Sequence, residues 1–201
     1  MAATIDYFLA PQSPWTYLGH ERFAAIAAAA GAKVNVLPVD LGRVFPVSGG
    51  LPLAKRAPQR QTYRLLELKR FSAYLGRPMN VQPKYFPVNG DDAAKLIIAV
   101  DLHDGTGAAM KVAGAVMRGV WESQQNIADP SVLQSMLEAC ALPARRLEDS
   151  QSQLVHERYE QDSQRAIDSG VFGAPSYVVD GEMFWGQDRL DFVERKLAGV
   201  G

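Results

Sequence analysis

The sequence predicts an α/β fold in which a βαβ unit at the start of the chain and a ββα unit at its end are separated by an all-helical insertion. Two observations support this prediction. Apolar residues alternate, as they do in strands, only near the two ends of the chain, whereas helical periodicity fills the middle. We therefore expect residues 1–50 and 170–201 to form one discontinuous domain, and residues 51–169 to form a helical insertion domain.

The first unit begins with an apolar run at residues 4–9, which predicts a strand. A helix over about 14–30 follows, because Ser13 is a favourable N-cap and Pro14 suits the first helical position. Residues 33–40 alternate again and predict a second strand, which the helix joins to the first in a right-handed crossover.

The insertion is predicted from apolar residues at helical spacing and from acidic helix starts at Asp91 and Asp129. After it, short apolar runs at 177–179 and 183–185 flank a turn and predict a hairpin, and a terminal helix is expected over 188–197. The helices expected in the insertion cover residues 57–75, 91–102, 107–125, 130–140 and 147–169.

The composition is that of an ordinary globular protein. Of 201 residues 47% are hydrophobic, and 21 basic against 22 acidic side chains leave a net charge of −1, so we expect no nucleic-acid partner. No apolar run approaches the roughly 18 residues of a membrane-spanning helix, and we expect no membrane partner. The N-terminus lacks a signal-peptide pattern, which favours a cytoplasmic location.

Cysteine and histidine usage gives little support to redox or metal chemistry. The single cysteine, Cys140, cannot form an internal disulfide and is expected to pack as a small apolar residue. His20, His103 and His156 are far apart without metal-ligand spacing, so we expect no metal site and interpret them as surface or partly buried helical residues.

Ser13 has two interpretations. It is a good helix cap, which requires no further function. A helix start also concentrates partial positive charge and free N–H groups, and there a serine hydroxyl can donate a hydrogen bond to the sulfur anion of a ligand and lower its thiol pKa. We do not expect Ser13 to be a covalent nucleophile, because His20 lies about 10 Å further along the same helix.

Two segments near the end of the chain also have alternative interpretations. Pro175 is either an ordinary turn proline or a cis-proline that exposes the backbone of Ala174 for antiparallel pairing with a peptide-like ligand. Asp188, at the start of the last helix, either offsets the helix dipole or binds an ammonium group beside free N–H groups that take a carboxylate. A γ-glutamyl end carries both charges.

These segments resemble the 2-hydroxychromene-2-carboxylate isomerase and kappa-class glutathione transferase family, in the DsbA-like branch of the thioredoxin-like fold. The match runs over nearly the whole chain. The motifs that carry it are Ser13-Pro14-Trp15-Thr16-Tyr17-Leu18, Leu41-Gly42-Arg43-Val44-Phe45 with Gly49-Gly50, Gly173-Ala174-Pro175, and Trp185-Gly186-Gln187-Asp188-Arg189-Leu190.

The resemblance implies a thioredoxin-like fold, glutathione as the cofactor and a homodimer. It implies that Ser13 is catalytic and faces the glutathione sulfur. It further implies that Ala174 and Pro175 pair with the tripeptide backbone. In the same way, Gln187 and Asp188 are expected to hold the γ-glutamyl end.

Gly50 and Arg60 are candidate cofactor-binding residues at which the chain departs from the family pattern. Many relatives have an asparagine in place of Gly50 and a lysine in place of Arg60. An arginine can meet a carboxylate through two parallel hydrogen bonds, although a solvated helix face is the ordinary interpretation of Arg56, Arg60 and Arg64.

The leading hypothesis is a glutathione-dependent isomerase that interconverts 2-hydroxychromene-2-carboxylate and trans-o-hydroxybenzylidenepyruvate, or acts on a related aromatic 2-oxo acid. The second is a kappa-like glutathione transferase or peroxidase, and the third is a non-catalytic module that binds thiols or peptides. A dithiol oxidoreductase is disfavoured by the lack of a second cysteine. Candidate substrate walls, which core packing would also explain, are Trp15, Tyr17, Phe45 and Tyr85.

Overall fold

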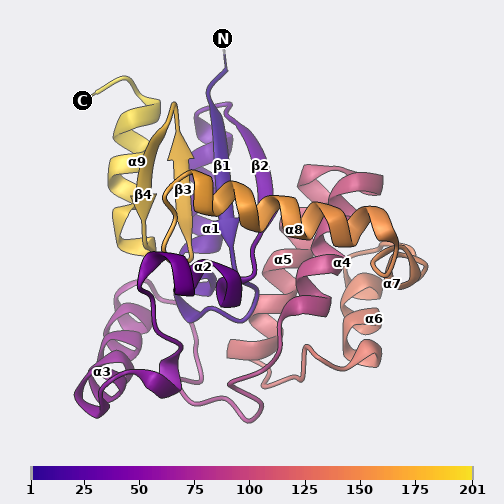
Figure 1. Cartoon of the computed structure of the whole chain (residues 1–201), viewed down its shortest axis with the longest axis horizontal. Helices are drawn as coiled ribbons and strands as arrows, with labels where there is room; N and C mark the ends of the chain where they lie inside the picture. The colour runs from indigo at the N-terminus through magenta and orange to yellow at the C-terminus, as the bar shows by residue number, and fades with distance from the viewer. Residues whose placement is uncertain (1, 201) are drawn as a thin grey trace.

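The computed structural model describes residues 2–200 and contains a four-stranded mixed sheet with helices on both faces (Figure 1). The strands are β1 (Thr4–Leu9), β2 (Lys33–Pro38), β3 (Ser176–Val179) and β4 (Glu182–Trp185), in the order β2-β1-β3-β4. β1 pairs with β2 in parallel, and β3 pairs with both β1 and β4 in antiparallel fashion. The predicted βαβ and ββα units are therefore confirmed.

The first helix, α1 (Pro14–Ala29), begins where its caps predict. The hydroxyl oxygen of Ser13 accepts a hydrogen bond from the N–H of Thr16 at 3.3 Å, and Pro14 occupies the first helical position. The helix ends just before Gly31, whose φ of 59° is easily adopted only by glycine. These signals fix the end of the helix that carries Ser13.

The predicted insertion is helical, and the helices differ from expectation at two places, one within the insertion and one just before it. The interval 147–169 is not one helix, because Ser152 caps a new helix after a short one. A helix over residues 41–48, which the sequence did not suggest, is capped by Asp40. The remaining helices are α2 (Leu41–Ser48), α3 (Pro58–Tyr74), α4 (Asp91–Asp104), α5 (Thr106–Trp121), α6 (Pro130–Ala139), α7 (Arg146–Asp149), α8 (Gln153–Asp168) and α9 (Leu190–Leu197), with 3₁₀ turns at Leu53–Lys55 and Gln187–Arg189.

The sheet is buried on both faces. On one face, α1 and α9 pack on a cluster that includes Tyr7 and Tyr177, and on the other α2 and α8 pack on Phe8 and Leu37. Figure 1 shows α8 crossing the front of the sheet, α4–α7 grouped beside β2, and α3 at the lower left. The first cluster continues into the inserted helices as far as Trp121, so sheet and insertion share a core. The division at residues 51 and 169 stays a prediction.

Cys140 is buried in this shared core, as expected. Across residues 2–200, no helix is both long and apolar enough to cross a membrane. In the same part of the chain, His, Cys, Asp and Glu side chains do not gather in groups of three or more that could hold a metal ion.

Candidate active site

Ser13 and Ala174, which are far apart in the sequence, meet beyond the end of β1 and the start of β3, the two central strands of the sheet. The peptide bond between Ala174 and Pro175 is cis, as one of the two interpretations of this proline required. The hydroxyl of Ser13 donates to the carbonyl of Ala174 at 3.3 Å, a long distance for a bond between two oxygens. This weak bond leaves the hydroxyl free to exchange its acceptor for a ligand atom.

The start of α1 presents a free donor beside this contact. Pro14 has no N–H, and the N–H groups of Thr16 and Tyr17 are accepted by the side chain and the carbonyl of Ser13. The N–H of Trp15, at the second helical position, has no acceptor within the helix. Together with the helix dipole, this donor favours an anion near the Ser13 hydroxyl.

Two adjacent cavities surround Ala174. The first, of about 590 Å³ and called here the Ser13 cavity, is lined by Ser13, Gly50, Arg60 and Ala174. The second, of about 580 Å³ and called the Gln187 cavity, is lined by Arg60, Ala174, Gln187 and Asp188. Both volumes fall in the range of about 300–1,000 Å³ typical of small-molecule sites. The residues common to both are Trp15, Arg56, Arg60, Arg64, Ala174 and Trp185.

Every candidate site residue except Pro175 therefore lines one of these cavities. Pro175 lies directly behind the lining, where its carbonyl accepts the N–H of Gly186 at 2.9 Å. This bond connects the cis-proline loop to the turn that carries Gln187 and Asp188. The structure thus brings all the predicted positions together.

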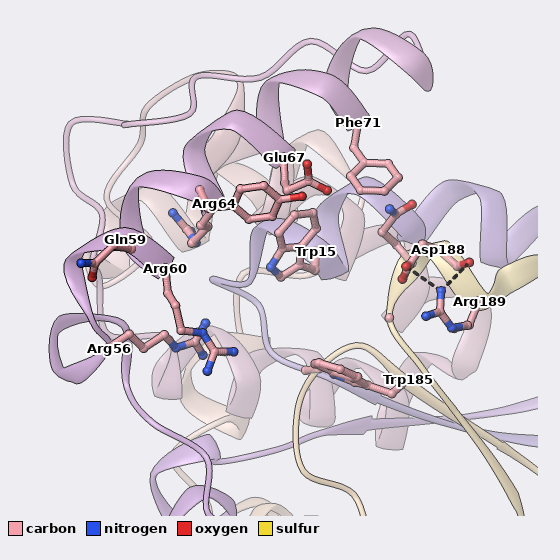
Figure 2. Close-up of a pocket in the computed structure, with 14 residues that line it drawn as sticks. Trp15, Arg56, Gln59, Arg60, Arg64, Glu67, Phe71, Trp185, Asp188 and Arg189 are labelled. Atoms are coloured by element: carbon pink, nitrogen blue, oxygen red, sulfur yellow. Dashed lines mark hydrogen bonds and ion pairs between the residues drawn. The ribbon is translucent and has the colours of Figure 1, made fainter.

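The turn at the end of the Gln187 cavity combines a buried amide and an exposed carboxylate. Gln187 is 2% exposed, and its Nε2 atom has no hydrogen-bond partner among the described residues. Asp188 is exposed and forms an ion pair of 2.6 Å with Arg189 (Figure 2). The Asp188 carboxylate faces solvent-accessible space and can meet an ammonium group of a ligand.

Arg56, Arg60 and Arg64 extend from α3 and the residues just before it into the space shared by the two cavities. Figure 2 shows the side chains of Arg56 and Arg60 directed toward the gap between Trp15 and Trp185. Among the described residues, none of the three arginines forms an ion pair with a carboxylate. A solvated helix face does not describe Arg56 and Arg64, which are partly buried, and burial and the charge of a neighbouring arginine lower the pKa of both. Arg60 is exposed at the mouth of the same space.

A family model of DsbA-like thioredoxin domains matches residues 4–198. The chain belongs to this family. The 2-hydroxychromene-2-carboxylate isomerase of Sphingobium xenophagum is 27% identical to this chain, in an alignment that covers 98% of this chain and 99% of that enzyme. The enzyme of the same name from Pseudomonas putida is 25% identical, in an alignment that covers 96% of this chain and 93% of that enzyme.

Solved structures of the family share the fold. A 2-hydroxychromene-2-carboxylate isomerase matches with a TM-score of 0.80 at 24% identity, covering 98% of this chain and 99% of the other. The cytosolic disulfide reductase DsbM from Pseudomonas aeruginosa, solved with GSH, matches with a TM-score of 0.69 at 18% identity, covering 97% and 99%. The thioredoxin-like fold and the family predicted from the sequence motifs are confirmed.

The departure at Gly50 has a structural partner in Phe45. A Cβ atom on residue 50 would lie 2.3 Å from Cδ1 of Phe45, so the phenyl ring fills the space that a side chain at position 50 would need. Phe45 is itself part of the lining of the Ser13 cavity. The space beside Gly50 is thus closed by an aromatic wall.

The expected aromatic walls are only partly present. Trp15 and Phe45 line the cavities. Tyr17 is 1% exposed and bonds to Glu122 at 2.7 Å, so it belongs to the core, while Tyr85 lies outside the lining of both cavities. Trp185 and Phe86, which sequence reasoning missed, take part instead. Trp185, at the end of β4, stands in one of the family motifs, which did not mark it as a wall, and no motif marks Phe86, which reaches the cavity through the path of its loop.

His20 is 5% exposed, which corrects the expectation of a surface or partly buried residue; His103 and His156 are exposed. Its Nε2–H donates to the carbonyl of Met110 at 2.9 Å, and its Nδ1 accepts from the hydroxyl of Tyr7 at 3.0 Å. Burial lowers the pKa of His20 to about 4, so the ring is neutral at neutral pH. Because both ring nitrogens are bonded to Tyr7 and Met110, His20 does not act as a base for Ser13. It fastens α1 to α5 and to the sheet.

Proposed function

We propose that the protein is a glutathione-dependent isomerase that interconverts 2-hydroxychromene-2-carboxylate and trans-o-hydroxybenzylidenepyruvate, or acts on a related aromatic 2-oxo acid. The observation that carries the proposal is the contact between Ser13 and Ala174 at the junction of two cavities with aromatic and cationic walls. Relatives named 2-hydroxychromene-2-carboxylate isomerase, similar over the whole chain, support the reaction class.

The residues present fit glutathione. Ser13 and the N–H of Trp15 would face the sulfur, and the backbone of Ala174 beside Pro175 would pair with the tripeptide. Gln187 and Asp188 would take the γ-glutamyl end, where the exposed Asp188 carboxylate would meet its ammonium group. Arg60, beside Gly50 in the Ser13 cavity, would hold the carboxylate at the other end.

When bound, glutathione would supply a thiolate for reversible addition to the conjugated double bond of the substrate. Ser13 would polarise rather than attack: its hydroxyl, held only by a weak bond to the Ala174 carbonyl, would donate to the sulfur and favour the ionised form of the thiol. The dipole of α1 acts in the same direction. Trp15 and Phe45 exclude water from the reacting atoms.

The test is to follow the absorbance of 2-hydroxychromene-2-carboxylate with the protein, with and without glutathione. We expect conversion only when glutathione is present, with its total concentration unchanged at the end. No rate above background in either case contradicts the isomerase. Net consumption of glutathione would instead indicate a transferase or peroxidase.

A cytoplasmic location and a homodimer complete the proposal. The cytoplasm is reducing, and the unpaired, buried Cys140 is compatible with such a compartment. Cell fractionation and sedimentation of the purified protein test the two points separately.

A further inference from the structure

The Ser13 cavity carries a strong excess of positive charge. Of the residues that line it, the charged ones are Arg56, Arg60 and Arg64, and no acidic residue takes part in its described lining. The whole chain has a net charge of only −1, so this excess is local. A largely apolar cavity with three cations is suited to anionic ligands.

The acidic residues of the neighbouring Gln187 cavity do not neutralise these arginines. Glu67 pairs with Arg70 at 2.6 Å, and Asp188 pairs with Arg189 at 2.6 Å. Each carboxylate thus already has a cation of its own. Figure 2 shows Asp188 and Arg189 on the side of the cavity away from the three arginines.

Arg64 differs from the other two arginines in how it is held. Its guanidinium carbon lies 5.1 Å from the centre of the Phe86 ring and 5.9 Å from that of Trp121. Burial and, second, the charge of Arg56 lower its pKa to about 10, so it stays protonated at neutral pH. Among the described residues no hydrogen-bond acceptor or carboxylate contacts it. The aromatic rings fix the plane of the cation and leave its N–H fork available.

We propose that Arg64 binds the carboxylate of the aromatic substrate and thereby selects acids over neutral compounds. This inference rests on the proposed function, in which Arg60 holds a carboxylate of glutathione and a second anion must be accommodated in the same cavity. A planar guanidinium held against aromatic rings makes two parallel hydrogen bonds to a carboxylate.

The walls beside Arg64 fit the rest of such a molecule. Phe86, whose ring lies against the Arg64 guanidinium, and the next residue, Pro87, both line the Ser13 cavity. Phe45 and Trp15 line the same cavity. An aromatic ring can pack on these side chains while its acid group meets Arg64. This arrangement orients the conjugated chain of the substrate toward Ser13.

Calorimetry with 3-phenylpropionate and 3-phenylpropionamide, in the presence of glutathione, tests the inference without turnover. The wild-type protein should bind the acid more tightly than the amide. Arg64→Met should reduce this preference roughly tenfold or more, because a hydrogen-bonded charge pair is lost, while the affinity for glutathione and for the amide stays the same. Arg195→Met, a change at an exposed arginine of α9 away from both cavities, is the matched control and should change neither.

Arg64→Lys covers the case in which the methionine variant does not fold, because it keeps the charge. It loses the planar two-point contact, so the preference should still fall severalfold. An unchanged preference in the folded variants, or no preference in the wild type, overturns the inference. A protein that prefers the acid through Arg64 but isomerises nothing would instead contradict only the proposed function.

Discussion

The two walls of the cavities are built differently. The wall next to the sheet consists of Ser13, Ala174 and Gln187, which are buried and offer backbone groups or short polar side chains. The wall formed by α3 offers long charged side chains, such as Arg60 and Arg64, on a helix of which only Leu68 is buried. The first wall is suited to hold one ligand in a fixed position, and the second to determine which second ligand enters.

The largest effect expected at the sheet wall is that of Ser13→Ala. Turnover should fall by about 10²–10³-fold, as for loss of one hydrogen bond to a developing anion. Stability should fall by only about 1 kcal/mol, because the cap to Thr16 is lost. Steady-state kinetics and urea unfolding measure the two quantities.

Ser152→Ala is the matched control, since Ser152 caps α8 through the N–H of Val155 as Ser13 caps α1. It should lose similar stability and keep full turnover. Equal activity losses in the two variants would mean that Ser13 acts only as a cap.

The sheet wall also depends on neutral His20, which fixes α1. The unfolded chain has a histidine pKa of 6.5 against about 4 in the fold, so the unfolded state binds more protons between these values. The stabilisation by neutral His20 is therefore complete above pH 6.5 and is lost as the pH falls toward 4. The loss amounts to about 3 kcal/mol, and urea unfolding at pH 7 and pH 4.5 measures most of it.

His20→Gln should be less stable at pH 7 and lose less stability on acidification than the wild type. Asp162, whose pKa burial raises to about 6, contributes an opposite trend, but equally in both proteins. Parallel pH curves for the two proteins would show that His20 is not held neutral.

Gly19→Ala tests how closely α1 must approach the Gln187 turn. A Cβ atom there would lie 2.8 Å from Cβ of Gln187 and 3.1 Å from the hydroxyl of Tyr177. We expect a destabilisation of about 1–3 kcal/mol and severalfold weaker binding of glutathione, measured by calorimetry. Gly107→Ala, at a helical position with open space around it, should leave glutathione binding unchanged and raise stability by up to about 1 kcal/mol, because alanine favours the helix.

The smallest effect is expected at the junction of the two walls. Gly50→Ala forces the ring of Phe45 aside and should weaken glutathione binding severalfold. The double variant Phe45→Ala/Gly50→Ala should bind glutathione more tightly than the summed binding free-energy changes of the two single variants predict, because the clash is gone. Strict additivity in calorimetry would show that the two residues are not coupled.

Much of the sheet wall was predictable from the sequence. Caps such as Ser13 and stop signals such as Gly31 act locally, so they mark the ends of α1 without knowledge of the fold. The motif around Pro175 pointed to the loop that faces Ser13. The break at Ser152 was not predicted, because its cap lies in a short polar stretch inside the single helix expected over residues 147–169.

The α3 wall was less predictable, because its function depends on tertiary contacts. The spacing of Arg56, Arg60 and Arg64 placed them on one side of a helix, but a solvated face gives the same pattern. Only the contact of Arg64 with Phe86 and Trp121 shows that this side is turned toward a cavity. Nothing in the sequence near Gly50 indicates that Phe45 fills the space beside it.

The most direct measurement is a pH titration of the ultraviolet thiolate absorbance of glutathione bound to the protein. We expect the thiol pKa to fall from about 8.5 toward neutrality in the complex, and Ser13→Ala to return it toward the free value. A bound thiol that titrates like free glutathione in the wild-type protein would contradict the role proposed for Ser13.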